Sequence, residues 1–216
     1  MTRLTYIKPT KHMLPIILLL SLCTTTLHAQ EIKTSPTTPN KTLKTQVPQI
    51  KTTPKQQERV VFLLSGYEFF PKRADLDKVG SAKEITSILL SIAQNPKQST
   101  LQRIRAIDAM GYYNMAFTNA YLVQRINVDL KTVASKGQRR FARSQRHHAI
   151  LSIARAQGEL ALPMMQKMMS HSNFQVRLTA IDAIGKHCGK KGKATLKKLQ
   201  KADKNPVVQR MLKKHL

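Results

Sequence analysis

Hydrophobic residues recur with helical spacing along the chain from residue 56 to residue 216. In the stretch that begins at Arg103, the apolar residues Ala106, Ile107 and Met110 are spaced so that they fall on one face of a helix. Similar spacing continues through the rest of this region. The pattern therefore predicts an all-α fold, with one buried face on each helix.

A nine-residue phrase, Arg-x-x-Ala-Ile-Asp-Ala-apolar-Gly, begins at Arg103 and again at Arg177. A divergent copy begins at Arg146, and a shortened fourth copy has Gln209 in the place of the arginine. A second amphipathic segment follows each of the first three copies. Each phrase and its following segment predict a two-helix hairpin, and stacked hairpins bury a core that one hairpin cannot. We expect about four helix pairs and a C-terminal half-repeat over residues 56–216, the first pair being degenerate.

Two positions of the phrase have a predicted backbone role. Asn173 and Asn205 open the two later copies, and asparagine is a favourable N-cap residue. Gly111 and Gly185 close two of the copies, where a residue just past a helix end often needs a positive φ.

The charged residues of the phrase are expected to be structural. Arg105 and Asp108 lie three positions apart, a spacing that favours an ion pair on the surface of a helix. Asp108 and Asp182 occupy the same place in two copies, and we expect neither to act as an acid or base.

The third copy and its second segment, VRLTAIDAIGKHCGKKGKATLKKLQ, resemble the HEAT repeat in the short bacterial form named after phycobilisome lyase. That form reads Asp-x-x-x-Val-Arg-x-x-Ala-x-x-Ala-Leu-Gly, followed by a helix with spaced leucines. The matching positions are Val176, Arg177, Ala180, Ala183, Ile184 and Gly185. The resemblance covers residues 98–216 well and residues 56–94 weakly. It implies a right-handed α-solenoid of HEAT-like helix hairpins, which usually bind partners along the second helices.

Residues 1–29 have the composition of an export signal peptide. A basic segment precedes an apolar core that is too short to span a bilayer, and a cleavage position follows Ala29. Cys23 supports an alternative, attachment of a lipid at that cysteine. We expect an exported, periplasmic protein, with lipid anchoring through Cys23 as the minor alternative. In the cleaved form Cys188 is the remaining cysteine, and we expect it to be buried.

Residues 30–55 are rich in threonine, lysine and proline and contain no aromatic residue. Such a segment cannot bury enough apolar surface to offset the entropy lost on ordering, so we expect a disordered tether. The predicted organisation is a signal peptide, this tether and a HEAT-like repeat domain over residues 56–216.

Basic residues dominate the charge of the chain. Of the formal net charge of +26, +3 belongs to residues 1–29 and +4 to residues 30–55, which leaves +19 on the predicted domain. No acidic residue interrupts the sequence between Asp129 and Glu159 or between Asp182 and Asp203. The candidate binding residues on two basic helix faces are Arg139, Arg140, Arg143, Arg146, Lys190, Lys191, Lys193, Lys197, Lys198 and Lys201. The first three of these lysines are expected in a turn before a helix.

Sequence motifs for catalysis are weak. No His-Glu dipeptide of the metal-dependent hydroxylases with this fold occurs, and no Gly-rich phosphate loop or serine nucleophile motif occurs. His147 and His148 are adjacent, so on a helix they point about 100° apart and chelate a metal poorly. The sequence therefore predicts a non-enzymatic protein with no cofactor, metal site or small-molecule substrate.

Two binding functions follow from this pattern. The first is a scaffold or adaptor for protein–protein interaction in the bacterial envelope, with an unidentified, acidic protein as partner. It predicts an apolar groove between basic rims. The alternative is a binder of an anionic envelope polymer, lipid surface or nucleic acid, which predicts affinity that falls steeply with salt.

Overall fold

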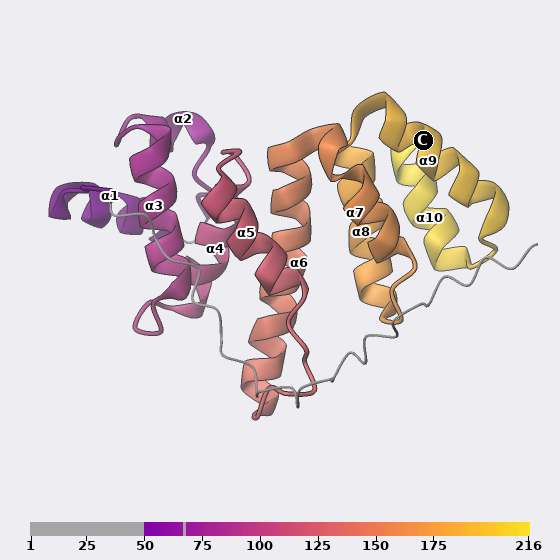
Figure 1. Cartoon of the computed structure of the whole chain (residues 1–216), viewed down its shortest axis with the longest axis horizontal. Coiled ribbons are helices and arrows are strands. Elements are labelled where there is room, and N and C mark those ends of the chain that lie inside the picture. Colours follow the sequence, from indigo (N-terminus) through magenta and orange to yellow (C-terminus); the bar gives the residue numbers. More distant parts are fainter. Residues whose placement is uncertain (1–49, 67) are drawn as a thin grey trace, which may run out of the picture. The chain divides into compact units, whose positions relative to one another are not determined.

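The computed structural model describes residues 50–66 and 68–216 of the chain. The predicted signal peptide (residues 1–29) and most of the predicted tether (residues 30–55) lie outside the described residues and stay predictions. All described residues belong to one compact unit. They form helices, turns and loops and contain no strand, which confirms the all-α expectation (Figure 1). No helix in this part of the chain is long and apolar enough to cross a membrane.

The helices follow one another along the chain with short connections. They are α1 (Pro54–Ser65), α2 (Arg73–Asp77), α3 (Ala82–Gln94), α4 (Thr100–Met110), α5 (Ala116–Ile126), α6 (Lys136–Gln157), η1 (Gly158–Ala161), α7 (Leu162–Met169), α8 (Phe174–His187), α9 (Gly189–Ala202) and α10 (Pro206–His215). The four copies of the phrase lie on α4, α6, α8 and α10.

The phrase helices and α1 form one layer, in which α1 packs on α4, α4 on α6, α6 on α8 and α8 on α10. The intervening helices form a second layer, in which α3 packs on α4, α5 on α6 and α7 on α8. This stack confirms an α-solenoid. From the sequence we expected each phrase helix to pair with the segment after it, and α8 and α9 do pair in that way. In contrast, α5 packs mainly against the following phrase helix, α6, so the middle hairpins are shifted by one helix.

Helix starts follow the capping residues. Asn173 and Asn205 cap α8 and α10 as predicted, and each side chain accepts hydrogen bonds from two backbone N–H groups of the first turn. The first helix begins at Pro54, two residues before the expected domain boundary. Thr53 and Gln56 form a capping box there, and a proline is favourable at the first helical position.

The apolar positions of the phrase form the core. In α4, α6 and α8 the paired alanine and isoleucine of each copy are at most 1% exposed. These residues are Ala106, Ile107, Ala149, Ile150, Ala180 and Ile181. Small alanines allow neighbouring helices to approach closely, and the isoleucines fill the space between them.

The glycines of the phrase do not have the predicted backbone role. Gly111 has a φ of −64°, and Gly185 lies inside α8, so neither needs the left-handed region. Instead, each lies against the next phrase helix. A Cβ atom on Gly111 would lie 2.8 Å from the Cα atom of Ser152 in α6, and one on Gly185 would overlap the ring of His215 in α10. Close packing between repeats, not turn geometry, therefore requires glycine.

The first residue of every copy donates to a backbone carbonyl in the last turn of the preceding second-layer helix or in the loop just after it. The last carbonyl groups of a helix lack intrahelical partners, and a side-chain donor can satisfy them or those of the loop that follows. The donors are arginine side chains in three copies and a glutamine amide in the fourth. The hydrogen bonds run from Arg103 to the carbonyl of Ala93, from Arg146 to Val128, from Arg177 to His171 and from Gln209 to Gln200. The phrase thus fastens each repeat to the one before it.

The expected surface ion pair between Arg105 and Asp108 is wrong. Both residues are buried. The Arg105 guanidinium donates to the backbone carbonyls of Leu64 and Gly66 at the end of α1. The Asp108 carboxylate lies 3.4 Å from the Nδ1 atom of His148 in α6. Spacing along one helix missed these partners because they belong to neighbouring helices.

Candidate partner-binding groove

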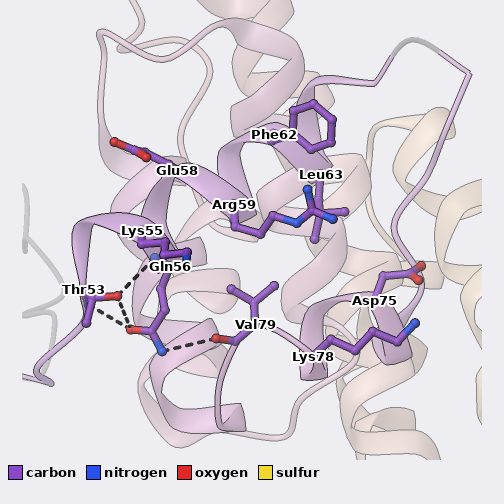
Figure 2. A pocket seen from close by; sticks show the side chains of 10 residues that line it. All are labelled: Thr53, Lys55, Gln56, Glu58, Arg59, Phe62, Leu63, Asp75, Lys78 and Val79. Atoms are coloured by element: carbon purple, nitrogen blue, oxygen red, sulfur yellow. Dashed lines mark hydrogen bonds between the residues drawn. The ribbon is translucent and has the colours of Figure 1, made fainter.

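An open groove of about 670 Å³ lies beside α1, at the N-terminal end of the described helices (Figure 2). One wall is α1, and the other is formed by α2 and the loop that leads to α3. The lining residues are Thr53, Lys55, Gln56, Glu58, Arg59, Phe62, Leu63, Asp75, Lys78 and Val79. Its volume falls in the usual range of ligand pockets, about 300–1,000 Å³.

Hydrogen bonds fix the floor of the groove at the start of α1. The Gln56 side chain closes the capping box with Thr53 and also donates to the Val79 carbonyl at 3.3 Å (Figure 2). The same amide donates to Glu84 of α3 at 3.4 Å. Hydrogen bonds from Ser81 and Gln56 lower the pKa of Glu84, which keeps its carboxylate ionised as an acceptor. The two walls are therefore connected before any partner binds.

Phe62 presents an unusually exposed aromatic ring at this groove. Its side chain is 66% exposed, whereas Val60 and Leu64 on the same helix are fully buried. The guanidinium of Arg59 lies over the ring, 5.1 Å from its centroid. An exposed aromatic residue beside an arginine is typical of the residues that dominate binding energy at protein interfaces.

Charged residues of both signs border the apolar part of the groove. Lys55, Arg59 and Lys78 are basic, and Glu58 and Asp75 are acidic. No lining residue is a histidine, cysteine or serine. Within the described residues no group of three histidine, cysteine or acidic side chains is placed to hold a metal. The arrangement suits binding of a partner by an apolar contact with polar surroundings.

The arginines predicted to form a binding face on α6 have different environments. Arg140 and Arg143 are exposed. Arg139 donates to the carbonyls of Val133 and Ala134 at 2.9 and 3.1 Å, so it holds the loop before its own helix. Arg146 is only 8% exposed, and burial lowers its pKa. The expected face of Arg139, Arg143 and Arg146 is therefore reduced to one freely exposed member, Arg143.

The predicted lysines remain at the surface. Lys190, Lys191, Lys193, Lys197, Lys198 and Lys201 are all exposed. The first three lie in the opening turns of α9, which begins at Gly189, and not in a turn as expected. The left-handed φ of Gly189 and the Glu159 carboxylate at this end allow the helix to start early. Lys191 also pairs with Glu159, 3.5 Å away. The predicted lysines and arginines thus lie on two different helices, α9 and α6.

Cys188 is fully buried, as expected, and burial raises its pKa to about 11. The thiol is thus neutral at physiological pH and has little nucleophilic character.

Two half-buried histidines, His147 and His187, predict a pH dependence of stability. Burial is the largest cause that lowers the pKa of His147 and of His187 below the ordinary value of 6.5. The unfolded chain therefore binds protons more readily than the folded chain as the pH falls below about 6.5, and stability falls with it. We expect a lower melting temperature at about pH 5 than at about pH 7.5, a window above the titration of ordinary carboxylates.

Thermal unfolding of the wild type and of His147→Gln at both pH values tests this expectation. The substitution should reduce the difference in melting temperature between the two pH values. A difference unchanged in the variant would show that His147 does not contribute.

The sequence did not predict Phe62 as a groove residue, because it stands within an apolar run, ERVVFLLSGYEFF, that is typical of a buried helix. A helical plot of α1 separates it from the inward-facing Val60 and Leu64, and this was the available signal.

Comparison with known proteins supports the architecture. Residues 139–214 match the family model for HEAT repeats. No curated protein and no solved structure matches the chain. Together with the stacked phrase helices, the match supports a HEAT-like repeat arrangement in this part of the chain.

Proposed function

We propose that this protein is a non-enzymatic adaptor that holds a protein partner in the groove beside α1. HEAT repeats generally mediate protein–protein interaction or scaffolding. The observation that carries the proposal is the 66% exposure of Phe62 at the edge of a groove of about 670 Å³. Exposing so large an apolar ring has no benefit for folding, and a partner that covers it gains the free energy of burial.

The partner's chemistry follows from the groove. An apolar side chain of the partner covers Phe62, and acidic residues beside it meet Lys55, Arg59 and Lys78. The predicted export signal supports a partner in the bacterial envelope, in the periplasm or at the membrane surface. An apolar part and three basic residues of the lining support the proposal, although Glu58 and Asp75 add acidic positions to the border of the groove.

A second candidate function rests on α9. Its exposed lysines include Lys190, Lys193, Lys197 and Lys201, which share one side of the helix. No acidic residue lies within α9. Such a face supports binding of an anionic envelope polymer or lipid surface through counterion release.

The experiment is capture of envelope proteins by the full chain, with washes at low and then high salt. We expect one protein to stay bound at high salt, and Phe62→Ser to weaken its binding by about tenfold or more, as for a central aromatic anchor. The control is Leu160→Ser, because Leu160 is 79% exposed and lies in η1, away from the groove.

Equal binding by Phe62→Ser and the wild type would refute the groove as the partner site. Loss of all bound material at moderate salt, in every variant, would favour the polyanion function instead.

A further inference from the structure

A second, smaller cavity lies between α6 and α8, where the N-terminal end of α8 meets the middle of α6. Its volume is about 60 Å³. The lining residues are Leu130, Arg143, Arg146, His147, Ile150, Asn173, Gln175, Val176 and Thr179. Three of them are basic or titrate to a cation, and none is acidic.

Arg146 is the buried charge of this cavity. Its side chain is 8% exposed, and one terminal nitrogen donates to the carbonyl of Val128. Its Nε atom has no hydrogen-bond partner within the described residues. The negative charge of Asp129 raises the pKa of the Arg146 guanidinium from a distance, but no described acidic side chain forms an ion pair with it. A buried cation without a paired anion is costly, because its desolvation is only partly offset.

Two further nitrogen-bearing side chains line the same cavity, the cationic Arg143 and His147, which becomes a cation when it is protonated. Arg143 is exposed at the mouth of the cavity. The Nδ1 atom of His147 lies 2.9 Å from the hydroxyl oxygen of Thr179. That hydroxyl already donates to the carbonyl of Gln175 at 2.8 Å, so Nδ1 donates to it, and Nε2 is the nitrogen that gains a proton.

The N-terminal end of α8 favours a bound anion at this cavity. This helix has 14 residues, and its positive end, capped by Asn173, borders the cavity. Leu130, Ile150 and Val176 supply the apolar part of the lining, which lowers the local dielectric and strengthens interactions with a charge.

We infer that this cavity binds a single oxyanion, a carboxylate or phosphate group, between Arg143, Arg146 and His147. A cavity needs about 10–15 Å³ to hold one water, so about 60 Å³ accommodates a group with three or four oxygen atoms. The anion supplies the counter-charge that Arg146 lacks. The site lies on different helices from the groove beside α1 and does not depend on the proposed adaptor function.

The test uses the full chain at constant ionic strength, with inorganic phosphate and acetate titrated separately as probes. Proton NMR follows the imidazole signals of His147, assigned with His147→Gln. We expect the bound anion to raise the pKa of His147, because a nearby negative charge favours the protonated ring. Arg143→Gln should weaken anion binding by about tenfold or more, since it removes a charged donor at the mouth.

The matched control is Arg140→Gln. Arg140 is exposed on the same helix but does not line the cavity, so this variant loses the same charge and should bind as the wild type does. Because Arg143 makes no described hydrogen bond in the fold, its variant should remain folded, which the melting temperature checks.

The two probes separate the sources of the anion. A response to phosphate alone supports a free phosphate or a phosphorylated ligand, and a response to acetate supports a carboxylate side chain of a partner. No response to either probe at about 10 mM, a concentration that detects millimolar dissociation constants, overturns the inference. An equal loss of binding in Arg143→Gln and Arg140→Gln also overturns it, because it would show an effect of net charge alone.

Discussion

Replacing Gly111 with alanine is expected to lower the free energy of unfolding by about 1–3 kcal/mol, the usual cost of forcing extra atoms into a packed interior. The added methyl group would lie 2.8 Å from the Cα atom and 3.0 Å from the carbonyl oxygen of Ser152. Both are backbone atoms of α6, so no side-chain rotation removes the overlap. The helices α4 and α6 must separate, and this disturbs the stack on both sides.

The matched control is Gly137→Ala in the first turn of α6. A Cβ atom at Gly137 meets no other atom within 4 Å. Glycine in a helix is less stable than alanine by about 0.5–1 kcal/mol, so this change should raise stability by up to that amount. Urea denaturation of both variants measures the two effects under the same conditions. If both variants gained stability, close approach of α4 and α6 would not be the constraint on Gly111.

The apolar positions of the phrase were predictable from the sequence because their pattern is local. The spacing of Ala106 and Ile107 requires only a helix with one buried face, and three copies of the phrase repeat it. The role of Gly111 was not predictable in this way. A glycine at the end of a phrase fits a left-handed cap or a close helix contact equally well, and the deciding atoms belong to Ser152 in another repeat.

The candidate sites show the same limit. Helical spacing places Arg143 and Arg146 on related sides of α6, but it does not show that Arg146 reaches the carbonyl of Val128 and is buried. Likewise, Phe62 is apolar and stands among apolar residues, so composition favours a core position. Its exposure follows from the arrangement in space: within the described residues, no further helix covers that side of α1.

The fifth position of the phrase shows how the place of a copy in the stack decides the residue. It holds Ile107, Ile150 and Ile181 in the first three copies, and all three are at most 1% exposed. The fourth copy, on α10, has Lys213 there, and this side chain is exposed. Each isoleucine lies on a helix with a neighbour of the same layer on both sides, whereas α10 packs mainly on α8 and α9 among the described helices.

Ile181→Ala should therefore lower the free energy of unfolding by about 2–5 kcal/mol, because it removes buried methyl groups and leaves a cavity between α8 and its neighbours. Lys213→Ala, at the same position of the last copy, should change it by no more than about 0.5 kcal/mol. Equilibrium denaturation of the two variants tests the comparison directly. Equal effects at the two positions would contradict a stack in which α10 forms an outer layer, since both side chains would then have to meet the same packing environment.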